Sequence, residues 1–437
     1  MTRHISNLAV VVALTITPAI PVAAQDGPAA PRVFTQIDVQ GNSRFSDGDV
    51  LATAGLQPGG VYGEDDLRAA IEDLEFTGEF DSVRMRSAGD RLTVTVDETP
   101  EFEGRLIFGA GFDSDSGAFG GAAVSIENAL GIGAEIQGEV TIAEEVQTAR
   151  LTIFDPDALG ETIGAGIRLS YSNFDFDNTL FAYERFAIAP YLSFDLGSAG
   201  RLATRLEFSQ TDLSEVDPTA SAILQGEVGE QDAISFGVTY IYGGVDRRVD
   251  ALTWGALLDV EYAFAGDADY IRTQAQADVF QPLPAGFALR STLKLGHITG
   301  LDGFTPRATD RFVLGGSALR GFERGTVSVR DIDGATVTNL GGNSYGVLRI
   351  DLLLPVFAEQ TALDVFVFGD LGSVWDLETS TAPSGTLLDD ATLRSSVGIG
   401  ASYDFDFGRL EAYIAAPGSD EIGDEDQVFG LTFRARF

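Results

Sequence analysis

Residues 429–437 read FGLTFRARF, a stretch in which every second residue is apolar. The odd-numbered positions include the apolar residues Phe429, Leu431 and Phe433. The even-numbered positions carry glycine, threonine and arginine. Successive side chains of a β-strand point to opposite faces, so this pattern predicts a strand with one apolar and one polar face. Such a strand separates an apolar environment from a wet one.

The same alternation recurs along most of the chain before this stretch. From residue 104 onward, sixteen runs of roughly ten residues alternate in polarity and show no helical period. The chain is also rich in glycine (51) and phenylalanine (30), which suits aromatic-flanked strands. We therefore predict a mainly β fold. The predicted strands are 104–113, 118–128, 133–143, 146–154, 162–172, 183–195, 201–212, 232–242, 252–264, 270–281, 286–298, 343–354, 361–374, 392–404, 409–416 and 427–437.

The connections between these runs alternate in length and composition. One set is short and contains glycine or proline, and the other is often longer and acidic. Tight turns at one end and extended loops at the other are typical of outer-membrane barrels. We predict a 16-stranded antiparallel transmembrane β-barrel over residues 100–437, in which 300–342 is the long sixth outer loop. The short connections include 155–160, 281–284 and 404–408, and the long ones are 213–231, 300–342, 376–391 and 417–427.

Charge and composition exclude several classes of function. Lys and Arg number 28 against 66 Asp and Glu, a net charge of −38, which repels nucleic-acid phosphates and anionic headgroups alike. We expect no nucleic-acid partner, and any membrane contact must rest on apolar surface. The chain has no cysteine, and its only histidines are His4 and His297, which argues against thiolate or histidine chemistry. The acidic stretch 418–426 lacks the ligand spacing of a calcium loop. We expect no cofactor, no metal and no catalytic residue.

The N-terminus has the pattern of an export signal. Arg3 and His4 precede an apolar run, and small residues follow at 22–24. We predict a signal peptide over residues 1–24 and a linker over 25–31. No later stretch offers about 20 uninterrupted apolar residues, so a membrane-embedded mature chain must use a closed barrel that satisfies its backbone groups.

Residues 32–99 form a predicted compact α+β unit. An alternating run at 34–39 precedes two short helices, the first with Ser46 and Asp49 placed for a capping box. The second helix begins after Gly63 and carries apolar residues at helical spacing. Two further alternating runs follow, so the predicted order is β-α-α-β-β.

The quoted residues of this unit carry a family resemblance. IDVQGNSRFSD, LQPGGVYGEDDLRAAIEDLEFTGEFDSV and LTVTVDETP resemble a POTRA domain of the BamA/TamA outer-membrane assembly superfamily. The resemblance implies a periplasmic module that receives unfolded or partly folded client chains through an exposed sheet edge, where unpaired backbone groups can bind an extended peptide. The alternative is a small packing domain without a client.

The sixth loop carries a second match to the family. Within GGSALRGFERG, residues 315–325, the run Leu319-Arg320-Gly321-Phe322 resembles the family's Val/Ile-Arg-Gly-Phe/Tyr motif. Guanidinium is planar, permanently charged and able to bind carboxylates in a bidentate manner, and glycine permits a tight turn. We therefore predict that Arg320, Gly321 and Phe322 fold inward as a lumen clamp.

Two downstream segments supply the predicted partners of the clamp. RIDLLLP, residues 349–355, places Asp351 where the family usually has glutamate, and FVFGDLGSVW, residues 366–375, matches the family's Phe-x-Asp-x-Gly strand with Phe368, Asp370 and Gly372. We predict that Arg320 pairs with Asp370 and Asp351, while Phe322 packs beside them.

The resemblance also implies a seam between the first and last strands that opens as a lateral gate. Gly109, Gly111 and Gly430 would weaken pairing at this seam, because glycine packs nothing; the other interpretation is that glycines accommodate barrel curvature. Phe433 and Phe437 would belong to the C-terminal signal by which barrels are recognised for assembly.

The function implied by the family is an outer-membrane protein assembly or insertion factor, not an enzyme. Its expected partners are client proteins, outer-membrane lipid and other envelope assembly proteins. Its expected location is the bacterial outer membrane, with the POTRA domain in the periplasm. One POTRA unit instead of several indicates an accessory factor or paralogue. Two alternatives stay open: a two-partner secretion transporter with one dedicated passenger, and a passive barrel channel.

Overall fold

The computed structural model describes residues 31–43, 45–77, 79–98, 103–113, 117–129, 133–160, 162–175, 180–247, 251–357, 362–405 and 408–435. The predicted signal peptide, all but the last residue of the linker, and Phe437 lie outside these ranges. The chain divides into two compact units between Pro100 and Glu101. Among the described residues, no helix is both long enough and apolar enough to cross a membrane.

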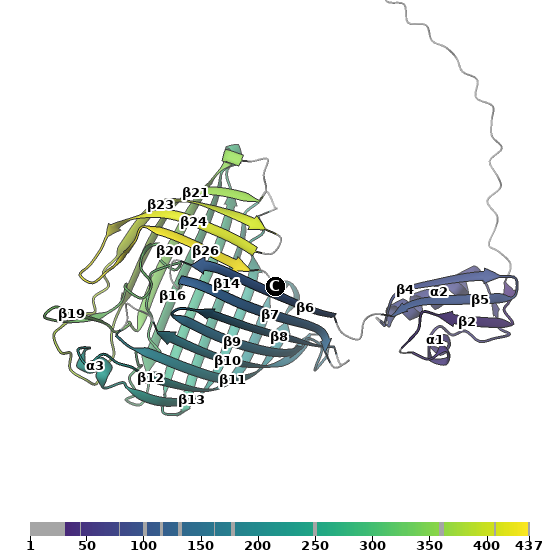
Figure 1. Ribbon diagram of the computed structural model, residues 1–437, viewed down its shortest axis with the longest axis horizontal. Helices are drawn as coiled ribbons and strands as arrows, with labels where there is room; N and C mark the ends of the chain where they lie inside the picture. Colours follow the sequence, from purple (N-terminus) through teal and green to yellow (C-terminus); the bar gives the residue numbers. More distant parts are fainter. Residues whose placement is uncertain are drawn as a thin grey trace, which may run out of the picture. The chain divides into compact units, whose positions relative to one another are not determined.

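The first unit is a small α+β fold (Figure 1). Its elements are β1 (Arg32–Val33), β2 (Gln36–Gln40), α1 (Asp47–Thr53), β3 (Val61–Tyr62), α2 (Glu64–Phe76), β4 (Phe80–Ala88) and β5 (Arg91–Glu98). The main sheet has the order β2-β5-β4, in which β5 is parallel to β2 and antiparallel to β4. Strands β1 and β3 form a separate pair. The edges of the main sheet are therefore β2 and β4.

Local sequence signals explain the helices of this unit. The side chain of Ser46 accepts from the amide of Asp49, and Asp49 accepts from the amide of Ser46, which is the capping box expected from the sequence. Helix α2 carries three acidic residues in its first turn, where they favour the positive end of the helix. Leu74 of α2 and Leu92 of β5 are fully buried in the core between helices and sheet.

The second unit is a 16-stranded antiparallel β-barrel sheet that contains every predicted strand (Figure 1). Neighbours in the sheet are consecutive in the chain, apart from the short strands of the loops, so the topology is up-and-down. The strands are β6 (Glu103–Asp113), β7 (Gly117–Ala129), β8 (Ala134–Ala143), β9 (Val146–Asp155), β10 (Ile163–Asp175), β11 (Ala182–Asp195), β12 (Arg201–Ser214), β13 (Gly229–Gly244), β14 (Thr253–Gly266), β15 (Tyr270–Pro282), β16 (Ala288–Gly300), β20 (Ser344–Leu354), β21 (Leu363–Trp375), β23 (Arg394–Phe405), β24 (Gly408–Ser419) and β26 (Phe429–Ala435).

The up-and-down topology places the short and the long connections at opposite ends of the barrel. The long loops carry small elements of their own, and the short connections carry three 3-10 turns. Strands β19-β18-β22 form one small sheet and β17-β25 another, so the long loops pair with one another. These elements are η1 (Gly197–Ala199), α3 (Ala222–Gln225), η2 (Pro284–Gly286), β17 (Gly321–Phe322), β18 (Arg330–Asp333), β19 (Thr336–Asn339), η3 (Pro355–Phe357), β22 (Thr386–Leu388) and β25 (Asp426–Gln427).

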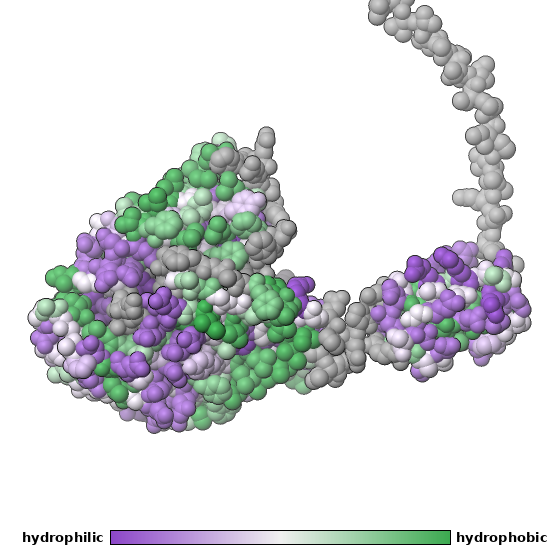
Figure 2. Space-filling view, viewed as in Figure 1, coloured by the Kyte–Doolittle hydropathy of each residue, from purple (hydrophilic) through white to green (hydrophobic). Residues whose placement is uncertain are grey.

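The outside of the barrel wall is apolar. On β14, Leu258, Tyr262 and Phe264 are exposed, whereas the alternate residues Asp259 and Glu261 turn to the inner face and bind Arg205. Figure 2 shows hydrophobic residues over the strands and hydrophilic residues gathered at the loop end, around α3 and β19. The alternation of the sequence therefore divides an apolar outer surface from a charged interior.

The seam of the barrel lies between β6 and β26. These two strands stand at the opposite ends of the sheet order and lie alongside each other (Figure 1). Over the residues that the structure describes in them, no β-ladder joins the two strands. The sheet therefore curves into a barrel in which the described residues of the first strand, β6, and of the last strand, β26, are not paired with each other.

Candidate functional site

The sixth loop, residues 301–343, is folded inward and largely buried. A tight turn begins at Gly315, whose φ is +125° and where a Cβ atom would lie 2.0 Å from the carbonyl oxygen of Glu323. Only glycine tolerates this close approach. The turn carries Arg320 to the inner face of β20 and β21, where the arginine is fully buried.

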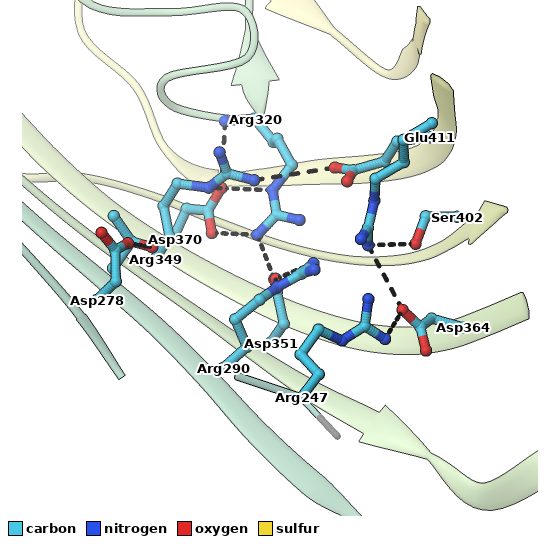
Figure 3. A network of polar contacts seen from close by, with 12 residues as sticks. Arg247, Asp278, Arg290, Arg320, Arg349, Asp351, Asp364, Asp370, Ser402 and Glu411 are labelled. Carbon is cyan, nitrogen blue, oxygen red and sulfur yellow. Dashed lines mark hydrogen bonds and ion pairs between the residues drawn. The ribbon is translucent and has the colours of Figure 1, made fainter. Parts of the chain in front are cut away.

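Arg320 binds two carboxylates of the barrel wall (Figure 3). Its Nε donates to Asp370 Oδ2 at 2.8 Å and its Nη2 donates to Asp370 Oδ1 at 2.7 Å, a bidentate contact. Its Nη2 also donates to Asp351 Oδ1 at 2.6 Å. The backbone amide of Arg320 donates to Asp370 Oδ2 at 3.2 Å. The structure thus brings together the three residues that the motifs suggested, and aspartate at 351 reaches the guanidinium.

The surroundings keep this guanidinium charged and oriented. Its carbon lies 3.7 Å from the ring centroid of Phe368 and 5.7 Å from that of Phe366, a cation–π arrangement. Ser396 of β23 donates to the carbonyl oxygen of Arg320. Burial opposes the charge, but the hydrogen bonds and charges of Asp370 and Asp351 raise the pKa of Arg320 above its ordinary value.

Two further arginines, which the motifs did not reveal, complete the cluster. Arg290 of β16 donates through Nε to Asp351 Oδ2 at 2.8 Å, so that Asp351 lies between two guanidinium groups. Arg349 of β20 donates to the carbonyl oxygen of Ser317 at 2.7 Å, and its Nε lies 3.7 Å from Asp370. Arg349 stands within the predicted motif, and its alternation with Asp351 is the signal that could have identified it.

The two glycines of the motifs, Gly321 and Gly372, lie where the sixth loop and the barrel wall approach each other closely. A Cβ atom at Gly321, where φ is +96°, would lie 2.9 Å from Ser396, and one at Gly372 would lie 3.1 Å from Leu319. Phe322 is fully buried, but within a cluster of loop and wall residues that includes Leu319. The rings that lie over the guanidinium are those of Phe368 and Phe366, and the packing of Phe322 beside the ion pairs stays a prediction.

A second group of ion pairs lies next to the Arg320 cluster, toward the short-turn end of the barrel (Figure 3). Arg247, in the short connection after β13, forms ion pairs with Asp364 of β21 and Asp404 of β23. Arg409 of β24 lies 3.5 Å from both of these carboxylates and also binds Ser402. Strand β13 is eighth in the sheet and β21 is thirteenth, so Arg247 connects two distant parts of the wall (Figure 3).

Buried arginines also join the long loops to one another. Arg330 of the sixth loop and Arg394 of β23 both bind Asp424 in the loop before β26, and Arg394 also binds Glu421. The side chains of both arginines are at most 1% exposed. The loops at this end therefore form one cross-linked layer.

The predicted seam and signal residues are placed as follows. Gly109 and Gly111 lie in β6 and pair with Gly121 and Phe119 of β7. Gly430 lies in β26, where the ring of Tyr413 fills the space that a side chain would need. Phe433 pairs with Leu410. Gly430 therefore accommodates a ring of the neighbouring strand.

The chemistry available to this site is positional. The carboxylates that face Arg320 are occupied by guanidinium groups, and no group of three or more metal-ligating side chains occurs in the described part of the chain. Arginine and carboxylate pairs of this kind hold a loop in place.

The fold combines three features: a 16-stranded up-and-down barrel, a small α+β unit before it, and a sixth loop bound inside the barrel. These features together are those of a β-barrel membrane protein. Residues 128–437 match the Omp85 superfamily domain, and residues 33–99 match the POTRA family described as surface antigen variable number repeat. The chain belongs to the Omp85 superfamily.

Two curated relatives are outer membrane protein assembly factors named BamA. The one from Neorickettsia risticii is 24% identical over 414 residues, covering 91% of this chain and 54% of the relative. The one from Neisseria meningitidis serogroup B is 24% identical over 377 residues, covering 79% and 47%. The chain spans about half the length of the curated relatives it matches. BamA from Haemophilus ducreyi lacking POTRA domains 1-3 shares the fold, with a TM-score of 0.70 and 17% identity over 93% of this chain and 85% of that chain.

Proposed function

We propose that this chain is an outer-membrane protein assembly or insertion factor, an accessory member or paralogue of its family with one POTRA domain. The proposal places the barrel, residues 100–437, in the bacterial outer membrane and the POTRA domain, residues 32–99, in the periplasm. Residues 1–24 act as the export signal and 25–31 as a linker. The names of the curated relatives support the role in assembly.

The observation that carries the proposal is the seam between β6 and β26, where the described residues of the two strands lie alongside each other without a β-ladder. Strand edges in a membrane barrel are normally paired, because lipid cannot satisfy backbone N–H and C=O groups. A passive channel has no use for an unpaired edge. An insertion factor uses such an edge as a template, since a client strand can pair with it before it moves into lipid.

The POTRA domain supplies the first contact with client chains in this proposal. Strands β2 and β4 are the edges of its sheet, and an extended client segment can add to either edge. Outer-membrane lipid contacts the apolar outer face of the barrel, and other envelope assembly proteins are further proposed partners. The buried carboxylates position the sixth loop, so no enzymatic step is required of them.

Depletion of the protein tests the proposal against its alternatives. We expect many barrel proteins to be lost from the outer-membrane proteome, because a general insertion step would fail. Loss of a single secreted protein would instead identify a two-partner secretion transporter. An unchanged proteome together with measurable conductance of the purified chain would identify a passive channel.

A cysteine cross-link tests the seam itself. The chain has no native cysteine, so single cysteines introduced in β6 and β26 form only the intended disulfide. We expect the cross-linked protein to lose client insertion and to recover it on reduction. The matched control links β7 to β8, which already pair along most of their length. Full insertion activity with the β6–β26 cross-link complete would refute the gate.

A further inference from the structure

A small cavity lies between the sixth loop and the outer ends of β10 and β11. Its volume is about 100 Å³, and its wall includes Phe174, Tyr183, Thr309 and Arg311. A single water needs about 10–15 Å³ of such space, so the cavity admits a larger group. We call it the Arg311 cavity.

Two polar residues on the wall of this cavity, the buried Arg311 and the half-buried Thr309, have buried hydrogen-bonding atoms without a partner. Arg311 is 5% exposed and its Nη2 binds Glu227, whereas its Nε and Nη1 have no partner. The hydroxyl of Thr309 also has none. Buried polar groups in folded proteins are normally paired, so these three unpaired groups at one cavity indicate a missing partner.

The position next to Arg311 must be a glycine, Gly341, because a side chain there would collide with the arginine. A Cβ atom at Gly341, where φ is +71°, would lie 2.8 Å from the Cβ atom of Arg311. Arg311 forms a direct ion pair with one carboxylate, Glu227, and the buried Asp310 also acts on its charge, whereas Arg320 forms direct ion pairs with two carboxylates. Burial lowers the pKa of Arg311 although Glu227 acts in the opposite direction. Additional negative charge beside this guanidinium would therefore be favourable.

The rest of the wall suits a compact anion. The rings of Phe174 and Tyr183 lie 4.9 Å apart, and Phe181 lies 6.2 Å from Tyr183. Aromatic edges carry partial positive charge, and an apolar wall strengthens any ionic contact inside. We propose that the Arg311 cavity binds a small oxyanion, a carboxylate or phosphate group, held by Arg311 and Thr309.

A bound oxyanion would connect the sixth loop to β10 and β11. This contact lies apart from Arg320, whose carboxylates belong to β20 and β21. The inference concerns ligand binding and goes beyond the proposed function in assembly, so either one can fail without the other.

Titration of the full chain, folded in detergent, tests the site. Inorganic phosphate, acetate and a short-chain phosphatidic acid are the probes, added at constant ionic strength and followed by calorimetry and by the thermal unfolding midpoint. We expect binding of one anion per chain, with a midpoint that rises with concentration because the ligand binds the folded state. Lysine retains the charge but not the planar set of donors, so Arg311→Lys should weaken binding about tenfold or more.

Two variants keep the result interpretable. Thr309→Val removes the unused hydroxyl with little change in volume and should weaken anion binding severalfold. This variant tests the site even if Arg311→Lys does not fold. Arg272→Lys is the matched control, because Arg272 also has a buried unpartnered Nε but contacts Phe312 and does not line the cavity. It should bind as wild type does.

The outcomes separate the ligand sources and can overturn the proposal. Binding of both inorganic phosphate and a short-chain phosphatidic acid, lost in Arg311→Lys, supports a site open to free and lipid phosphate. Binding of the lipid alone, with the same dependence, assigns the headgroup as the source. Equal affinities of the folded wild type, Arg311→Lys and Thr309→Val would show that the anion binds elsewhere, and either this result or no binding of any probe would overturn the proposal.

Discussion

Substitution of Asp370 by asparagine should release the sixth loop from the barrel wall. Asp370 accepts hydrogen bonds from Nε, Nη2 and the backbone amide of Arg320, and its side chain is fully buried. Asparagine retains the size but loses the charge and turns a donor toward Arg320. Removal of one partner of a buried ion pair costs about 3–5 kcal/mol. Because Asp351 still binds Arg320, we expect the lower end, about 3 kcal/mol, which is about a hundredfold in the opening equilibrium.

Hydrogen exchange of the purified protein measures this opening. The amide of Arg320 donates directly to Asp370, and the amide of Glu323 donates to the carbonyl oxygen of Glu425 in the loop before β26 at 2.8 Å, so both report on loop docking. Glu139→Gln is the control, because Glu139 and Arg150 form a solvent-exposed pair at 3.5 Å that contributes about 0–1 kcal/mol. Unchanged exchange at both loop amides in a folded Asp370→Asn protein would refute the assignment of Asp370 as the main anchor.

Three further predictions concern other parts of the wall and loops. Gly321→Ala should lower the free energy of unfolding by about 1–3 kcal/mol, and by more than Gly303→Ala; both glycines have positive φ, but only at 321 would a Cβ atom meet another residue. Equal losses in denaturant titrations would contradict the close-contact argument. Arg247→Gln should increase conductance in planar bilayers, because it removes the cross-barrel ion pairs at the short-turn end; an unchanged conductance would exclude that role. Asp424→Asn should make the loop before β26 cleavable by protease, since two buried arginines share this carboxylate, whereas the exposed Asp426→Asn should not.

The fold could be predicted because its signals are local. Alternation of period two identifies each strand without knowledge of its neighbours, and the alternating loop lengths indicate the two ends of the barrel. The 16-stranded sheet confirms this prediction. The capping residues Ser46 and Asp49 could also be identified from the sequence, because the capping box has a fixed three-residue spacing.

The site could be predicted only as far as the motifs extend. Arg320 and Asp370 stand in two family motifs, whereas Arg290 belongs to no motif and reaches Asp351 only because β16 pairs with β20 in a particular register. The contacts of Arg247 could not be predicted for a similar reason, since its partners lie five and six strands away across the barrel. The burial of Phe322 depends on the backbone turn at Gly321, which a motif does not specify.

The position of Asp351 has a consequence for the register of the barrel strands. Arg290 is the register partner of Asp351, and Arg349 is the register partner of Asp370. A slip of one residue in either pairing would turn these side chains to the lipid-facing side. The docked position of Arg320 therefore requires the observed register between β20 and β21, which places both of its carboxylates on the inner face. A barrel with slipped strands would therefore leave the sixth loop without the two carboxylates that hold Arg320.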